Sequence, residues 1–149
     1  MKFWGVLLVT CLGASAFASD RIEGAYVGEG VVDSAFSDTA SAASLTLGVR
    51  FAPDDALEII ECWDTHDGSP EAKACIASRY EIREESLYDN DRKVGDIFPG
   101  RIIVMIANSQ VAEQLRLEKR AGDSVRYEYT YVNVDGAATH RKGLLKKAN

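Results

Sequence analysis

The chain has 149 residues, with 17 basic and 23 acidic side chains and a formal net charge of −6. A net acidic chain is poorly suited to the phosphate backbone of nucleic acids, so we expect no nucleic-acid partner. The length suffices for one domain that buries roughly two thirds of the surface of its unfolded chain.

The first residues, MKFWGVLLVTCLGASAFASD, predict a secretory signal peptide. Lys2 precedes a short apolar run, and the small residues Ala16 and Ala18 place the cleavage after Ala18. Residues 1–18 are then the signal peptide, and residues 19–149 form the mature domain. The apolar run is too short to span a bilayer, and no later segment predicts a transmembrane helix. We therefore expect a periplasmic or secreted protein.

One of the three cysteines, Cys11, lies within the expected signal peptide. Cys11 could instead be lipidated, but Thr10 fits poorly the small residue preferred at the preceding position. Removal of the signal peptide leaves Cys62 and Cys75, and in an oxidising compartment two remaining cysteines most simply form one disulfide. Their spacing fits neither a redox CxxC motif nor a zinc site.

The mature chain alternates apolar and polar residues, as half-buried strands do. In ASLTLGVRF, over residues 43–51, every second residue is apolar, and in SVRYEYTYVNV, over residues 124–134, one face collects a valine and three tyrosines. Turn signals separate such runs at short intervals, so we expect about nine or ten strands. This number of short strands indicates an all-β sandwich or barrel. The turn signals are Pro53-Asp54-Asp55, Asp67-Gly68, Asn90-Asp91, Pro99-Gly100, Ala121-Gly122-Asp123 and Asp135-Gly136.

Residues 70–86 fit two kinds of structure. Ser69 as a cap and Pro70 in a first turn are typical of a helix start. The same segment also alternates as a strand would, and we favour the strand because of the charges near the cysteines. If Cys62 and Cys75 are directly opposed in an antiparallel hairpin, opposite charges face one another, which is typical of a sheet register. The pairs are Asp64 with Lys73, Glu58 with Arg79, and Asp54 with Arg83.

A second hairpin closes around Ala121-Gly122-Asp123. It pairs Glu118 with Arg126 and Arg116 with Glu128 on the outer face. Two hairpins with charged outer faces and aromatic or aliphatic inner faces indicate a single antiparallel up-and-down β-barrel. The inner face of the second hairpin collects Leu115, Leu117, Tyr127, Tyr129 and Tyr131.

The two end strands carry a resemblance. The opening strand, Gly24-Ala-Tyr26-Val-Gly28-Glu-Gly30, resembles the first strand of calycin-type barrels, closest to the lipocalin-like and nitrobindin-like groups, although their usual tryptophan is Tyr26 here. The closing strand, Thr139-His-Arg-Lys-Gly143-Leu-Leu-Lys146, is similar to the last strand of nitrobindin-like barrels, where His140 falls near their haem-binding histidine. The resemblance implies a lipocalin-like barrel with a ligand cavity. We expect no cofactor, with haem as the alternative.

Glu61 is the strongest candidate for a site residue. With the cysteine face outside, it points inward opposite Ile76, beside Trp63. A buried carboxylate is costly unless it is protonated, hydrogen-bonded or paired with a cation. The alternative is that Glu61 lies near a barrel mouth and is hydrated, or that a β-bulge turns it outward. The other expected ligand-binding residues on inner faces are Tyr26, Tyr80, Glu113, Tyr127, Tyr129 and Tyr131, although such a tyrosine stripe is often simply core.

The last strand supplies a cation in either of two registers. A two-residue turn at Asp135-Gly136 sends His140 and Lys142 inward, whereas a three-residue turn sends Arg141 and Gly143 inward. An unpaired Glu61 would favour a neutral or cationic ligand head group. Pairing with a basic residue would leave that cation available to an anionic head group, such as a fatty-acid carboxylate, and we favour this second case.

These patterns predict a small-molecule binding protein, for a hydrophobic or amphipathic ligand, and we expect a monomer. The alternative is a protein-binding module of the cell envelope, such as an enzyme inhibitor, with a filled interior. We expect no enzyme, because the sequence contains no GxSxG, HExxH or phosphate-loop motif. We also expect no metal, since the loop with Asp64, His66, Asp67 and Glu71 matches no ligand spacing.

Overall fold

The protein is a closed antiparallel β-barrel of ten strands in a computed structural model. The structure describes residues 20–34, 39–67 and 72–149, so the signal peptide expected over 1–18 lies outside the described residues. Within the described part, no helix has the length and apolar character needed to cross a membrane. The strands are β1 (Gly24–Ser34), β2 (Ser41–Ala52), β3 (Ala56–Asp64), β4 (Lys73–Arg83), β5 (Ser86–Asp89), β6 (Arg92–Phe98), β7 (Arg101–Ala107), β8 (Val111–Arg120), β9 (Ser124–Asn133) and β10 (Ala138–Lys147).

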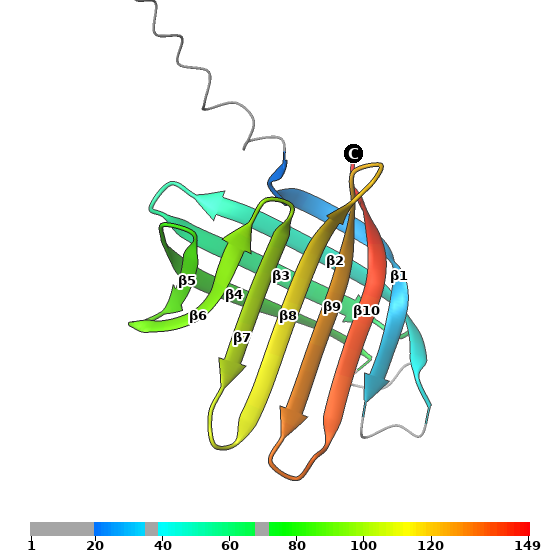
Figure 1. The fold of residues 1–149 in the computed structure, drawn as a ribbon. Helices are drawn as coiled ribbons and strands as arrows, with labels where there is room; N and C mark the ends of the chain where they lie inside the picture. Colours follow the sequence, from blue (N-terminus) through cyan, green and yellow to red (C-terminus); the bar gives the residue numbers. More distant parts are fainter. Residues whose placement is uncertain (1–19, 35–38, 68–71) are drawn as a thin grey trace, which may run out of the picture.

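Each strand pairs with its neighbours in the sequence, and β1 closes the barrel against β10. Figure 1 shows β7 to β10 side by side in one layer, with β2 to β4 crossing behind them. The all-β, up-and-down barrel predicted from the alternation is therefore confirmed. We call its two ends the Gly24 end, where β1 begins, and the Trp63 end, where β3 finishes.

The hairpin of β3 and β4 has the register predicted from its charges. Cys62 lies opposite Cys75, and the two form a disulfide. Residues 73–83 are a strand and not a helix, with Ala74, Ser78, Tyr80 and Ile82 less exposed than the residues between them. Ser69 and Pro70, on which the helix alternative depended, lie outside the described residues.

One of the three predicted charge pairs is wrong. Glu58 lies opposite Arg79, and Asp64 lies opposite Lys73. Asp54, however, lies in the turn before β3 and forms an ion pair with Arg79. Arg83 binds Glu81 and Asp91 instead, because β4 ends at Arg83, beyond the reach of the β3 ladder.

The hairpin of β8 and β9 also has the predicted register, with Glu118 opposite Arg126. Its ion pairs nevertheless run along the strands, from Arg120 to Glu118 and from Arg126 to Glu128. The two turns at the ends of β9 hold glycines with positive φ, 69° at Gly122 and 80° at Gly136. These backbone angles explain why glycine occupies both positions.

The core is densest toward the Gly24 end. The side chains that fill this half come from seven strands and the segment before β1. Each has at most 2% of its surface exposed, and together they form one packed cluster beneath the surface at this end. They are Ile22, Leu47, Leu57, Ile59, Leu87, Ile102, Leu117, Val125 and Leu145.

Candidate functional site

Glu61 is one of three buried polar or charged residues in the described part of the chain, with 5% of its surface exposed. It projects inward from β3, two residues after Ile59, and the hydroxyl of Tyr127 on β9 donates a 2.6 Å hydrogen bond to its Oε1. This bond satisfies part of a buried carboxylate whose desolvation would otherwise be costly. The inward assignment of Glu61 is confirmed by this burial and this bond.

Arg141 on β10 completes a buried cluster with Glu61 and Tyr127. Its Nε donates to the Tyr127 hydroxyl at 3.2 Å, and its Nη2 lies 4.0 Å from Glu61 Oε1. The guanidinium is stacked between Trp63 and Tyr129, with its central carbon 3.9 Å from each ring centroid. Nη2 is buried and has no hydrogen-bond partner, so the ion pair to Glu61 is its polar contact.

Burial dominates the electrostatics of this cluster. It raises the pKa of Glu61, while the Tyr127 hydrogen bond and the charge of Arg141 lower it and the charge of Glu113 raises it further. Burial, with the Glu61 charge, raises the pKa of Tyr127 well above its usual range. Burial and the charge of Glu113 raise the pKa of Tyr129 to about 12. Both tyrosines therefore remain protonated donors at neutral pH.

A cavity of about 110 Å³ adjoins Glu61 inside the barrel. Its polar groups come from Glu61, Ser78, Tyr80 and Glu113, and burial raises the pKa of Tyr80. The side chain of Ile76 also lines the cavity, yet 38% of its surface is exposed, so the barrel is open to solvent at the Trp63 end. The remaining lining residues are Val104, Ile106, Leu115 and Tyr129.

The cavity therefore presents two carboxylates, whereas the cation of the cluster lies between two rings. Glu113, which was expected on an inner face, is half-buried on β8, opposite Tyr131. The lining residues include both glutamates and Tyr129 but not Arg141. The predicted pairing of Glu61 with a basic residue of the last strand is found, but the paired cation is not presented to the cavity.

The structure brings most of the predicted site residues together. Trp63, Tyr80, Glu113, Tyr127, Tyr129 and Arg141 all surround or adjoin Glu61. Tyr131 is half-buried one step further toward the Trp63 end. Tyr26 does not join them, because it is buried at the Gly24 end, where its hydroxyl donates to the carbonyl of Glu23 at 3.2 Å.

His140 does not join the site either. The three-residue turn register holds, so Arg141 is 5% exposed inside the barrel and His140 is exposed on the outer face, 3.2 Å from the hydroxyl of Thr130. The interior haem site that the resemblance raised does not fit these residues. Its histidine points outward, and a cavity of about 110 Å³ is far below the several hundred Å³ of pockets for larger ligands.

Five lining residues were not predicted as site residues, and two of them, Ile76 and Leu115, were expected only to point inward. Ser78 lies on the inner face of β4, where its alternation with Tyr80 and Ile76 was the available signal. Val104 and Ile106 lie on β7, and the alternation in RIIVMIA would have placed both inside. Of the acidic loop, Asp64 accepts a hydrogen bond from the backbone of His66 at 2.9 Å, whereas Glu71 lies outside the described residues.

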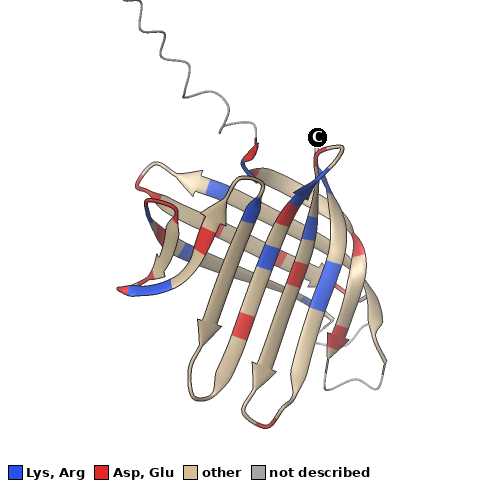
Figure 2. Cartoon of the chain, in the orientation of Figure 1, with Lys and Arg blue, Asp and Glu red and all other residues tan. Residues whose placement is uncertain are grey.

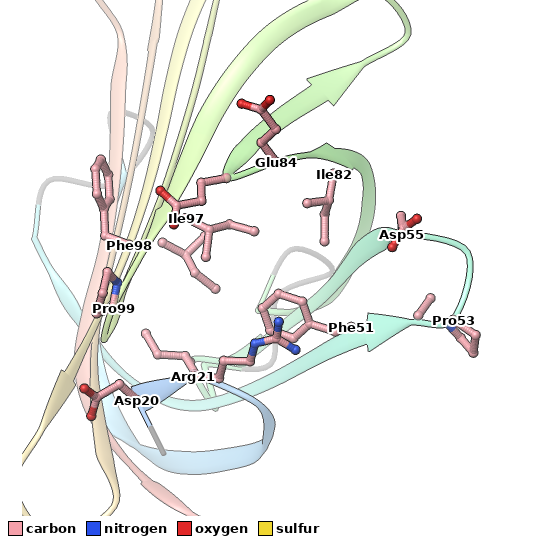
Figure 3. A pocket seen from close by; sticks show the side chains of 14 residues that line it. Asp20, Arg21, Phe51, Pro53, Asp55, Ile82, Glu84, Ile97, Phe98 and Pro99 are labelled. Atoms are coloured by element: carbon pink, nitrogen blue, oxygen red, sulfur yellow. The ribbon is translucent and has the colours of Figure 1, made fainter. Parts of the chain in front are cut away.

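A larger hollow of about 530 Å³ lies at the Gly24 end. Figure 3 shows Phe51, Ile82 and Ile97 in it, with Arg21 and Glu84 at its rim. Arg21 is stacked on Phe51 at 4.7 Å, and the charged side chains around the hollow are exposed. Exposed charges avoid the desolvation cost that buried charges carry, so we place the candidate site at Glu61, where the charges are buried.

Comparisons with known proteins show the fold alone. No protein-family model matches the chain, and no curated protein matches it. Among solved structures, it is similar to a protein of unknown function from the DUF3598 family of Nostoc punctiforme, with a TM-score of 0.61 and 12% sequence identity. The match covers 85% of this chain and 48% of that protein, so the chain spans about half the length of its structural neighbour.

Proposed function

We propose that the protein binds a small amphipathic molecule through the Trp63 end of the barrel. The head group lies in the cavity beside Glu61 and Glu113, and the apolar part passes Ile76 and Ile106 toward the mouth. The observation that carries the proposal is the buried Glu61 carboxylate at the floor of this cavity, because a buried charge reduces stability and requires a reason to be kept.

The charges of the cluster favour a cationic head group. Glu61 and Glu113 contribute two negative charges when both are ionised, and Arg141 contributes one positive charge. One negative charge therefore remains next to the cavity, where burial and the charge of Glu113 raise the pKa of Glu61. A primary ammonium group can donate three hydrogen bonds and would meet Glu61, Glu113 and the hydroxyl of Tyr80.

The disulfide supports a location of the protein outside the cytoplasm. Structural disulfides persist in oxidising compartments and are rare in cytosolic proteins, and Cys62 and Cys75 are bonded. Together with the signal-peptide pattern over residues 1–18, this supports a periplasmic or secreted protein. Binding would then take place in the extracytoplasmic space.

The small size of the cavity favours a second candidate function. Pockets for drug-sized ligands usually measure about 300–1,000 Å³, whereas the interior space here is about 110 Å³. A barrel with a mostly filled interior would suit a protein-binding module that works through its outer surface and loops. The two candidates differ in whether any small amphiphile binds.

Isothermal titration calorimetry with octylammonium, octanol and octanoate tests the proposal. We expect octylammonium to bind at one site, octanol more weakly and octanoate least. Glu113→Gln should weaken octylammonium binding by about tenfold, or about 1.4 kcal/mol. Glu118→Gln is the matched control, because Glu118 lies on the outer face of the same strand and pairs with Arg120.

Each outcome separates the candidates. If none of the three amphiphiles binds, the small-molecule function is wrong and the protein-binding module is favoured. If octanoate binds best, the ligand is anionic and Arg141 Nη2 is the group that receives it. An equal effect of Glu113→Gln and Glu118→Gln would place the bound molecule outside the cavity.

A further inference from the structure

The outer face of strands β1 to β4 carries two adjacent rows without a charged side chain. Opposed positions across the four strands give the first row, Ala25, Gly48, Ile60 and Ala77, and the second row, Val27, Thr46, Cys62 and Cys75. We call these eight residues the uncharged band. Ile60 and Val27 expose 51% and 45% of their surfaces, so its largest apolar side chains face solvent.

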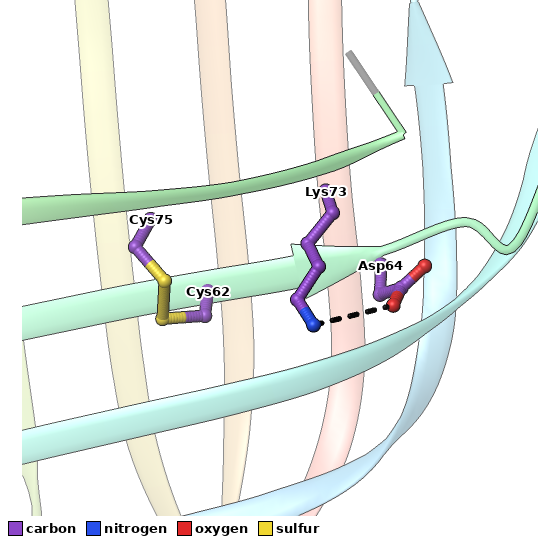
Figure 4. The surroundings of a disulfide bond; sticks show 4 residues. All are labelled: Cys62, Asp64, Lys73 and Cys75. Carbon is purple, nitrogen blue, oxygen red and sulfur yellow. Dashed lines mark ion pairs between the residues drawn. A yellow bond between two sulfur atoms is a disulfide. The ribbon is translucent and has the colours of Figure 1, made fainter. Parts of the chain in front are cut away.

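Charged rows border the uncharged band on both sides. Toward the Gly24 end, Glu58 lies between Arg50 and Arg79 and pairs with both. Toward the Trp63 end, Glu29 on β1 and Lys73 on β4 stand at the two extremes of the row. Figure 4 shows the disulfide and Lys73 on this outer face, with the Lys73–Asp64 ion pair beside the disulfide. Figure 2 marks the charged residues along all the strands, with β2 to β4 behind β7 to β10.

We propose that a second copy of the chain packs on the uncharged band, related by a two-fold axis that runs along the strands between β2 and β3. This axis places β2 over β3 of the second copy and β1 over β4 of the second copy. Ile60 of each copy then faces Gly48 of the other, so the most exposed apolar side chain of the band meets the position without a side chain.

The same axis makes the bordering charges complementary. Arg50 faces Glu58 of the second copy, and Glu29 faces Lys73 of the second copy. Because the axis is two-fold, each of these contacts occurs twice. Opposite charges thus surround the uncharged band on both borders, which is the arrangement that fixes register in interfaces.

The other way to superpose two such faces is unfavourable. A two-fold axis across the strands would place each strand over the same strand of the second copy. The charged row at the Gly24 end would then lie over the charged row at the Trp63 end of the second copy. Glu58 would then face Asp64, and Arg79 would face Lys73. These contacts join like charges, which disfavour a wrong arrangement. The order of charges along the two borders therefore selects the axis along the strands.

The size of the face predicts a weak dimer. Four strands about 4.8 Å apart and four rows about 6.8 Å apart cover roughly 500 Å² of projected area. Stable interfaces bury about 800 Å² on each partner. The dimer should therefore be concentration-dependent, with dissociation in the micromolar range or weaker.

Sedimentation velocity of the full mature protein at about 1 to 500 μM tests this, a range that brackets micromolar association. We expect a reversible shift from monomer to dimer. Ile60→Lys should raise the dissociation constant at least about tenfold. Met105→Lys is the control, because Met105 is 59% exposed on β7, away from the uncharged band. A cooperative urea unfolding transition, measured on dilute samples, verifies that each variant is folded.

A charge exchange gives the more specific test. Glu29→Lys and Lys73→Glu should each weaken the dimer, and the two together should restore it, because the exchanged side chains at these two positions again carry opposite charges across the interface. The two positions lie three strands apart within one chain, so rescue requires two copies. A protein that is monomeric at every concentration would overturn the proposal, and so would a dimer that Met105→Lys weakens as much as Ile60→Lys does.

Discussion

Replacement of Arg141 by methionine should strongly destabilise the barrel. Methionine keeps much of the volume between Trp63 and Tyr129 but removes the charge and the hydrogen bond to Tyr127. Unit charges 4.0 Å apart attract by about 4 kcal/mol at an effective dielectric constant near 20. A charged hydrogen bond contributes roughly 1.5–3 kcal/mol.

The desolvation of the arginine itself offsets part of these gains, so the terms do not simply add. Breaking one partner of a buried pair typically costs about 3–5 kcal/mol, because the other charge is left uncompensated. We expect this loss in the free energy of unfolding of Arg141→Met, measured by urea denaturation at neutral pH. The loss should exceed that of any exposed charge removed from the outer face.

A double-mutant cycle identifies the cause. In Arg141→Met/Glu61→Gln the buried carboxylate is neutral, so the double variant should be more stable than the sum of the two single changes predicts, by at least about 1 kcal/mol. If Arg141→Met costs less than about 1 kcal/mol, or if the two changes are additive, then Arg141 does not compensate the Glu61 charge.

Three further predictions concern the scaffold and the pH response. Cys62→Ser/Cys75→Ser should lower the free energy of unfolding by about 3 kcal/mol, since the disulfide closes a loop with a sequence separation of 13; equal urea midpoints would contradict this. Gly30→Ala should lower the free energy of unfolding by about 1–3 kcal/mol, because a Cβ there would overlap the Lys142 carbonyl oxygen and the Leu45 side chain. Gly48→Ala should change stability little, since its Cβ would lie 3.7 Å from the Cβ of Ile60. Burial raises the pKa of Glu61 above 4.5, so its native state retains a proton that the unfolded chain has released. The wild type should therefore lose stability relative to Glu61→Gln as the pH rises above 4.5; a gap that is constant with pH would show that Glu61 is not desolvated.

The sequence was informative wherever alternation and charge agreed. In β3 and β4 the opposed cysteines and the Glu58–Arg79 pair specified one register, because a shift by one residue would turn every inward side chain outward. The same reasoning placed Glu61 inside the barrel and the tyrosines of β9 around it. Charge contacts at strand ends were less predictable, as Arg79 shows by pairing with Asp54. Residues in a turn are not held opposite a partner by strand pairing, so their contacts do not follow from the register.

Sequence alone therefore determined the strands, the disulfide and the inward Glu61, since these depend on local period and on pairing between neighbours in the chain. Only the tertiary structure decided which cation meets Glu61. The turn at Gly136 allowed two registers of β10, and the choice is linked to a contact between β10 and β2, the two neighbours of β1. A Cβ at Gly143 would lie 2.8 Å from Cδ1 of Leu45 on β2 and 3.1 Å from the carbonyl oxygen of Glu29 on β1, so glycine fits the inner position there without movement of its neighbours. This close approach favours the register in which Gly143 points inward, which also places Arg141 between Trp63 and Tyr129 and turns His140 to the solvent.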